Sequence, residues 1–163
     1  MISVDPGTKV SAAARWADGE LQSVWWAPIP IDSGNLVIEV PVLRPYGKAD
    51  PQDILDLMRV VEKWAGQAGR IVEIKPETWK GQTPKPIHHR RILEALTPVE
   101  REVFAMACGH TVEDIRAYVR RACETLARLG VVARYSRKSH NLFDAVGIGL
   151  WYLGRTSRAG VKL

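Results

Sequence analysis

The chain opens with Met1-Ile-Ser-Val-Asp-Pro-Gly-Thr8, in which a short, mostly apolar run ends at an acidic residue and a Pro-Gly pair. This run predicts a short buried strand over residues 2–4. Pro6 and Gly7 are typical of a turn, and Asp favours the first position of such a turn. Asp5 is therefore either a turn residue or a functional carboxylate at the end of a strand.

Two more acidic residues lie in apolar surroundings. Glu39 lies within Leu36-Val-Ile-Glu-Val40, and Asp144 lies within Ser139-His-Asn-Leu-Phe-Asp-Ala145. Each has a simpler interpretation as a solvent-facing residue of an edge strand or a surface helix, but the apolar neighbours argue against it. Burying a carboxylate is costly unless a partner compensates its charge. We therefore expect Asp5, Glu39 and Asp144 to share a cation, and all-oxygen ligands favour Mg²⁺ or Mn²⁺ over zinc or copper.

The hydrophobic pattern of the whole chain predicts an α/β fold with a mixed five-stranded sheet flanked by helices. We expect strands at Ile2 to Val4, Val10 to Ala17, Leu21 to Ala27, Leu36 to Val42 and Arg70 to Ile74. We expect helices from Pro51 to Gly66, from Pro86 to Leu96, after Thr97, from about Thr111 to Gly130 and from about Ser139 to Leu153. A length of 163 residues suits one domain, with residues 156–163 as a loose tail.

Charge is distributed unevenly along the chain. Residues 1–75 contain 8 Lys and Arg against 10 Asp and Glu, whereas residues 76–163 contain 15 against 8. A basic excess attracts polyanions and gives salt-dependent affinity without encoding sequence. The alternative is a basic surface that has no ligand. Combined with a carboxylate metal site, the pattern favours nucleic acid as the partner.

Basic residues are concentrated around the expected fifth strand and the helix after it, where three prolines predict a stiffened loop that grips phosphates. They are Lys75, Lys80, Lys85, Arg90 and Arg91. A second basic group precedes the last expected helix and is expected to hold the phosphate beside the cut bond. It consists of Arg134, Arg137 and Lys138.

Three aromatic side chains lie among these basic residues. Trp79 either packs on a sugar or base, as a DNA-binding residue, or anchors the loop in the core. His88 and His89 are interpreted as surface residues, because neighbours on a helix do not converge on one metal.

Other functional classes lack support in the sequence. There is no Walker loop, no GxSxG and no HExxH motif, and Cys108 and Cys123 lack any CxxC spacing. No segment contains eighteen uninterrupted apolar residues, and no basic leader precedes the first apolar run. We therefore expect a cytoplasmic protein without a membrane partner.

The acids in their contexts resemble a known family. Asp5-Pro-Gly-Thr8 after a first strand, Glu39 in a later apolar strand and Asp144-Ala145 in a helix rich in small residues resemble the RuvC-type Holliday junction resolvases of the ribonuclease H-like superfamily. The stretches 76–85 and 144–151 are more similar to the phage-borne branch than to the chromosomal one. The resemblance implies a ribonuclease H-like sheet, a homodimer, cleavage of four-way and other branched DNA, and two Mg²⁺ ions about 3.5 to 4 Å apart.

The resemblance leaves the fourth metal-site residue open. In much of the family it lies three positions before the last Asp, where this chain has Asn141, while His140 lies four before it. Both offsets fall on the helix face that carries Asp144. We favour His140, because imidazole ligates metals and accepts a proton near neutral pH, whereas an amide ligates weakly and accepts no proton.

Related resolvases also place a wedge shortly after the strand-end Glu to unstack bases at the junction centre. The first aromatic residue after Glu39 is Tyr46, which we assign as this wedge. Its surroundings, Pro45-Tyr46-Gly47-Lys48, fit an exposed turn equally well.

Two other functions remain open. One is a nuclease of the same superfamily that cuts the RNA strand of RNA–DNA hybrids, and the other is a branched-DNA-binding protein without catalysis. The presence of all three acids argues against the second, because a mere binder has no reason to place carboxylates against phosphates.

Overall fold

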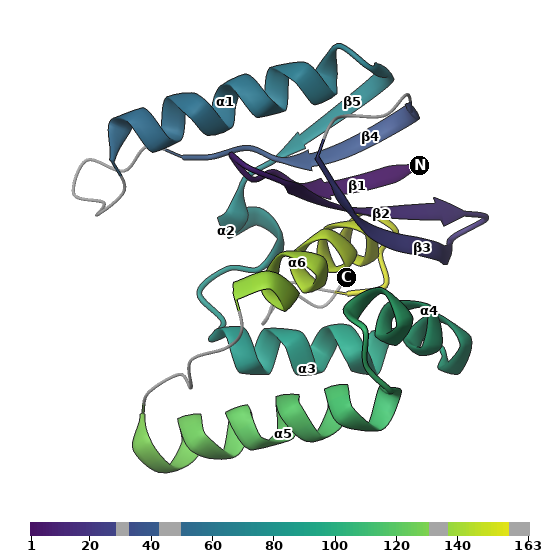
Figure 1. Cartoon of the computed structure of the whole chain (residues 1–163), viewed down its shortest axis with the longest axis vertical. Helices are drawn as coiled ribbons and strands as arrows, with labels where there is room; N and C mark the ends of the chain where they lie inside the picture. Colours follow the sequence, from purple (N-terminus) through teal and green to yellow (C-terminus); the bar gives the residue numbers. More distant parts are fainter. Residues whose placement is uncertain (29–32, 43–49, 131–136, 157–163) are drawn as a thin grey trace.

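A mixed five-stranded sheet lies at the centre of the structure, a computed structural model that describes residues 1–28, 33–42, 50–130 and 137–156 (Figure 1). The strands are β1 (Ile2–Asp5), β2 (Ser11–Ala17), β3 (Glu20–Ala27), β4 (Ser33–Glu39) and β5 (Ala68–Ile74), in the spatial order β3-β2-β1-β4-β5. The pairs β1–β2 and β2–β3 are antiparallel, whereas β1–β4 and β4–β5 are parallel. The predicted α/β fold, a mixed five-stranded sheet flanked by helices, is confirmed.

Two turns at the strand ends follow from local chemistry. Asp18 and Gly19 both have positive φ angles, 51° and 81°, as the predicted tight hairpin between β2 and β3 requires. The strand β4 ends at Glu39, earlier than the predicted Val42. Val40 still donates its N–H to the Ile74 carbonyl, but Pro41 has no N–H with which to continue the ladder. Glu39 is therefore a strand-end residue.

The helices begin and end largely where their capping residues predict. They are α1 (Pro51–Ala65), α2 (Pro76–Trp79), α3 (Lys85–Ala95), α4 (Pro98–Cys108), α5 (Val112–Leu129) and α6 (Arg137–Tyr152). Thr97 with Glu100, and Thr111 with Asp114, form capping boxes at the starts of α4 and α5. The short helix α2 lies in the segment predicted as a loop.

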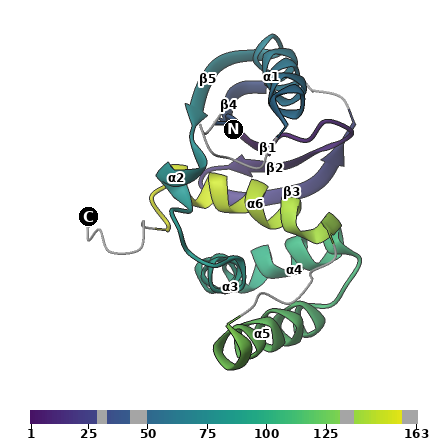
Figure 2. The same ribbon diagram turned by 90° about the vertical axis from the view of Figure 1, so that its left-hand side faces the viewer.

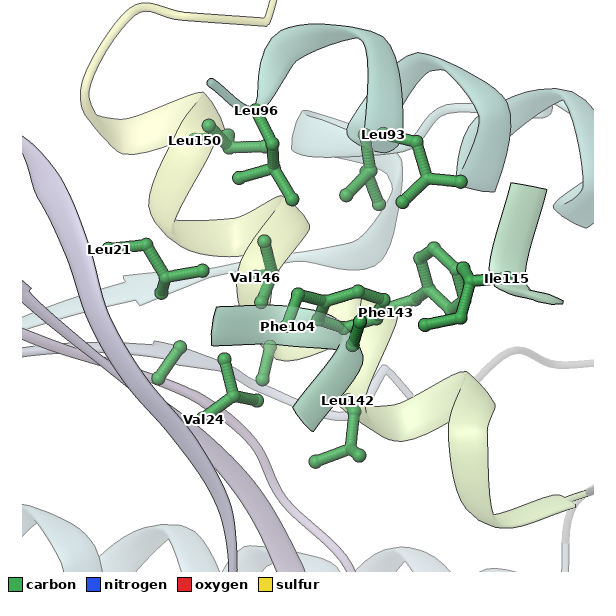
Figure 3. Close-up of a cluster of buried hydrophobic side chains, with 14 of the residues drawn as sticks. Leu21, Val24, Leu93, Leu96, Phe104, Ile115, Leu142, Phe143, Val146 and Leu150 are labelled. Carbon is green, nitrogen blue, oxygen red and sulfur yellow. The ribbon is translucent and has the colours of Figure 1, made fainter. Parts of the chain in front are cut away.

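The helices form layers on both faces of the sheet (Figure 2). One face packs against α1 through a cluster that includes Ile2, Val4 and Trp64. The other face packs against α6, and the larger core there extends to α3, α4 and α5 (Figure 3). The helix α5 packs on α3, and α4 packs on β3. Among the described helices, none combines the length and the hydropathy that a membrane span requires.

Candidate active site

Three carboxylates gather where β1 and β4 end. Val4 pairs with Ile38 across the two parallel strands, and the next residues are Asp5 and Glu39. Both acids therefore lie at the carboxyl ends of neighbouring strands. The helix α6 crosses this face and contributes Asp144. Asp5 is 9% exposed and Asp144 is 5% exposed. The structure thus brings together the three acids that the sequence analysis placed in one site.

A buried hydrogen-bond relay fixes α6 on the sheet beside these acids. Ser3 Oγ donates to the carbonyl of Ala145, at 2.7 Å, and accepts a hydrogen bond from Trp16 Nε1, at 2.8 Å. Gly149 permits the close approach of the indole, because a Cβ at this position would lie 2.3 Å from the Trp16 ring. Ser3 was not predicted as a site residue, although a polar residue two positions before Asp5 in a buried strand was a usable signal.

Lys80 extends its ammonium group into the carboxylate cluster. Its Nζ lies 3.1 Å from Glu39 Oε2 and 3.4 Å from Asp144 Oδ2. Trp79 Nε1 donates to the same Glu39 oxygen at 2.6 Å, and the ammonium lies 4.8 Å from the centroid of the Trp79 ring. Lys80 was predicted to grip phosphates from a loop. In the structure its charge is directed at the two carboxylates.

The electrostatics of the cluster reflect burial and crowding of like charges. Burial, together with the neighbouring Asp144 and Glu39, raises the pKa of Asp5 well above its usual value, and Lys80 only partly offsets this. Burial also raises the pKa of Glu39. Burial alone would lower the pKa of Lys80, but the surrounding carboxylates raise it. The site therefore carries excess negative charge that an added cation would stabilise.

The donor set fits a hard divalent cation. Asp144 Oδ1 is buried and has no hydrogen-bond partner among the described residues, so one carboxylate oxygen is available to a ligand. All three acids supply oxygen, which Mg²⁺ and Mn²⁺ prefer. In the described part of the chain, no three Asp, Glu, His or Cys side chains are already arranged to hold a metal. Glu39 and Asp144 instead contact the Lys80 ammonium, which would have to move before a metal could bind there.

The two candidates for the fourth metal-site residue have different neighbours. The His140 ring lies 5.3 Å from the ring of His89 on α3. Burial and Lys85 lower its pKa to about 4, so its imidazole is neutral at pH 7. Asn141 faces the loop after Asp5, where its Nδ2 lies 4.0 Å from the position of a Cβ on Gly7. The choice of His140 over Asn141 stays a prediction.

Two interpretations of residues in α2 and α3 are wrong. His88 is half-buried and His89 is completely buried, so neither is a surface residue. The His89 ring stacks on Phe143 with centroids 4.1 Å apart, and burial lowers its pKa to about 2. Trp79 is only 3% exposed, with Ile148 in its cluster, so its indole cannot pack on a sugar or base without leaving the core. The alternative that Trp79 is a core anchor is confirmed.

Of the other predicted DNA-binding residues, some are exposed and some lie outside the described part of the chain. Lys75, Lys85, Arg90 and Arg91 are exposed, and Arg91 donates to Thr83 Oγ1 at 3.4 Å. Tyr46 and Arg134 lie outside the described residues. Arg137 and Lys138 belong to the first turn of α6, but their side chains also lie outside the described part. These exposed basic side chains lie between Glu39 and Asp144 in the chain, and their contact with DNA stays a prediction.

No protein-family model matches the sequence, and no curated protein matches it. Among solved structures, the chain is similar to the structure of RuvC from Thermus thermophilus, with 12% sequence identity over 94% of this chain and 97% of that chain and a TM-score of 0.36. At this identity and TM-score, neither an activity nor residue roles are transferred to this chain.

Proposed function

We propose that this chain is a divalent-metal-dependent endonuclease that cuts four-way (Holliday) junctions and other branched DNA. The observation that carries the proposal is the convergence of Asp5, Glu39 and Asp144 at the ends of two parallel strands, with Asp144 Oδ1 unpartnered among the described residues. A buried oxygen cluster of this kind suits metal-assisted cleavage of phosphodiesters.

The three acids share one task in the proposed reaction, and the residues around them have others. Asp5, Glu39 and Asp144 would hold two Mg²⁺, or Mn²⁺ in substitution, which would supply an activated water and stabilise the leaving 3′ oxygen. The Trp79 indole orients Glu39 through its hydrogen bond. Lys80 offsets the charge of Glu39 and Asp144 before the metal binds. His140 is neutral at pH 7, which is the form of imidazole that ligates a metal.

Charge supports a nucleic-acid substrate, and a four-way junction in turn implies a dimeric enzyme. Exposed Lys75, Lys85 and Arg91 can contact the phosphates on either side of the cut without reading sequence. Paired cuts across a two-fold junction need two equivalent sites that face one substrate, which favours a homodimer. The family resemblance of the sequence motifs points to the same substrate.

The test is a side-by-side cleavage assay in Mg²⁺ with labelled four-way junctions, linear duplex and RNA–DNA hybrid. The proposal predicts cleavage of the junction in preference to the other two substrates. Preferential cleavage of the RNA strand would identify a hybrid-specific nuclease instead. Tight junction binding with no cleavage in Mg²⁺ or Mn²⁺ would identify a binding protein.

A further inference from the structure

A cavity of about 490 Å³ lies between β3, α4, α5 and α6, separate from the carboxylate cluster. Its lining is largely apolar and aromatic, and it includes Trp26, Cys108, Tyr118, Leu142 and Phe143. Figure 3 shows Leu142, Phe143 and Ile115 along this side of the core. Burial raises the pKa of the Cys108 thiol to about 12, which agrees with an apolar interior. Its volume is in the range of small-ligand sites.

The sheet register places this cavity next to the proposed cutting site. Asp5 pairs with Ala12, and Ala12 pairs with Trp26, so the three residues lie in one row across adjacent strands. Directly paired residues point to the same face, and Trp26 packs into the core on the α6 side, where Phe143 also lies. Two strand spacings separate the Cα atoms of Asp5 and Trp26 by about 10 Å. That distance spans about three stacked nucleotides, and fewer when the strand is unstacked.

Consecutive residues of α6 line the cavity and belong to the proposed active site. Leu142 and Phe143 line the cavity, and the next residue is Asp144. At the rim, α5 contributes the exposed side chain of Arg121, a cation suited to a phosphate. Aromatic walls, a nearby cation and a position beside the cut together match an unstacked nucleotide.

We propose that this cavity binds an unstacked nucleobase of the branched DNA, one to three nucleotides from the cut phosphodiester. The base stacks on Trp26, and Arg121 contacts its phosphate. This inference rests on the proposed nuclease function and adds a substrate subsite to it. Base stacking on an aromatic side chain tolerates every base, so the subsite selects unpaired nucleotides rather than a sequence.

The experiment uses the wild-type protein and four-way junctions in which one abasic site is moved through the three positions on each side of the cut. Dissociation constants are measured in Ca²⁺ and cleavage rates in Mg²⁺. We expect one position at which the loss of the base weakens binding by at least about fivefold, as the loss of one base stack implies. Little change is expected at the others.

Two variants test whether the sensitivity to an abasic site comes from base binding in the cavity or from a general property of abasic DNA. Ala117 lines the cavity from α5, and Ala117→Phe should weaken binding of intact junctions and remove the sensitivity to the abasic site. Trp25→Ala is the matched control, because Trp25 packs into the core on the α1 side of the sheet. It should keep the wild-type abasic profile, and thermal unfolding checks the fold of both variants.

The outcomes distinguish the two proposals. A flat abasic profile with normal cleavage of junctions would overturn the base site and leave the nuclease function standing. An Ala117→Phe variant that is folded and retains the abasic sensitivity would also overturn the base site. Failure to bind or cleave any branched DNA would overturn both.

Discussion

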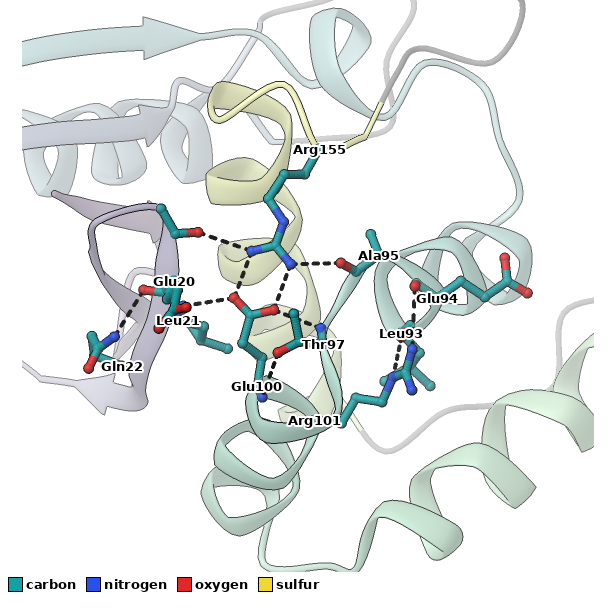
Figure 4. A network of polar contacts seen from close by, with 11 residues as sticks. Glu20, Leu21, Gln22, Leu93, Glu94, Ala95, Thr97, Glu100, Arg101 and Arg155 are labelled. Carbon is teal, nitrogen blue, oxygen red and sulfur yellow. Dashed lines mark hydrogen bonds and ion pairs between the residues drawn. The ribbon is translucent and has the colours of Figure 1, made fainter.

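Replacement of Glu100 by Gln should strongly destabilise the protein, because Glu100 is the centre of a buried network (Figure 4). Its side chain is 3% exposed and accepts hydrogen bonds from the Leu21 and Thr97 N–H groups, at 2.9 and 2.8 Å. Both terminal nitrogens of Arg155 also donate to it, each at 2.6 Å. Arg155 donates in addition to the carbonyls of Gly19 and Ala95. The network joins the β2–β3 turn and the α3–α4 connection to the end of α6.

The expected cost follows from these contacts. Both carboxylate oxygens of Glu100 accept hydrogen bonds, and in Glu100→Gln one of them is replaced by an NH₂ group, which is a donor. Arg155 also loses its counter-ion. Breaking a buried, hydrogen-bonded charge pair by removing one partner costs about 3–5 kcal/mol. For a chain of this length, each kcal/mol lowers Tm by about 2–4 °C, so we expect a fall in Tm on the order of 10 °C.

The assay is urea unfolding at several pH values, with Glu102→Gln as the control because Glu102 is exposed on the same helix. Burial alone would raise the pKa of Glu100, but hydrogen bonds from Arg155, Thr97 and Leu21 lower it from 4.5 to about 2. Its contribution to the free energy of unfolding is therefore complete above pH 4.5 and is lost as the pH falls toward 2. The Gln variant should lack this loss. A destabilisation below about 1 kcal/mol at pH 7 would refute the reasoning, because that is the size expected for an exposed pair.

Three further predictions concern the site. Lys80→Met should tighten Mn²⁺ binding at least about tenfold in calorimetry at pH 8, because an ammonium 3.1 Å from Glu39 repels the metal. Lys85→Met, at an exposed lysine, is the control. Unchanged affinity of the Lys80 variant for Mn²⁺ would contradict this role. His140→Ala should slow cleavage by orders of magnitude while Asn141→Ala is mild, and the reverse ranking would assign the fourth position to Asn141. Tyr46→Ala should slow cleavage of intact junctions but spare pre-nicked ones. Equal slowing of both would indicate that Tyr46 is an exposed turn residue and not a wedge.

The placement of the acids was predictable because burial of charge in apolar strands has few explanations. The predicted range of this strand ran on to Val42, whereas β4 ends at Glu39, and Pro41 carried the signal for the earlier end. His89 illustrates a different failure. It lies three residues after Pro86 and four before Leu93, on the buried stripe of α3, and this spacing predicts burial. That adjacent histidines do not converge on one metal does not make them surface residues.

The role of Lys80 was beyond what sequence patterns can predict. Its direction depends on the short helix α2, which ends at Trp79, and on the packing of that indole against Gly147, where a Cβ would lie 2.6 Å from the Trp79 ring. This contact joins segments far apart in the chain. Local charge and proline content indicated a basic loop, and only tertiary packing turns the ammonium toward Glu39 and Asp144.

The most direct test of the carboxylate site is the cleavage rate of Asp144→Asn on a labelled four-way junction in Mg²⁺, measured together with its affinity for the junction. The variant keeps the shape of the side chain and removes the charge of a buried ligand, so we predict a loss of at least about a hundredfold in rate with binding intact. Asp5→Asn and Glu39→Gln should behave in the same way. Cleavage by Asp144→Asn at a rate near that of the wild type would contradict the account.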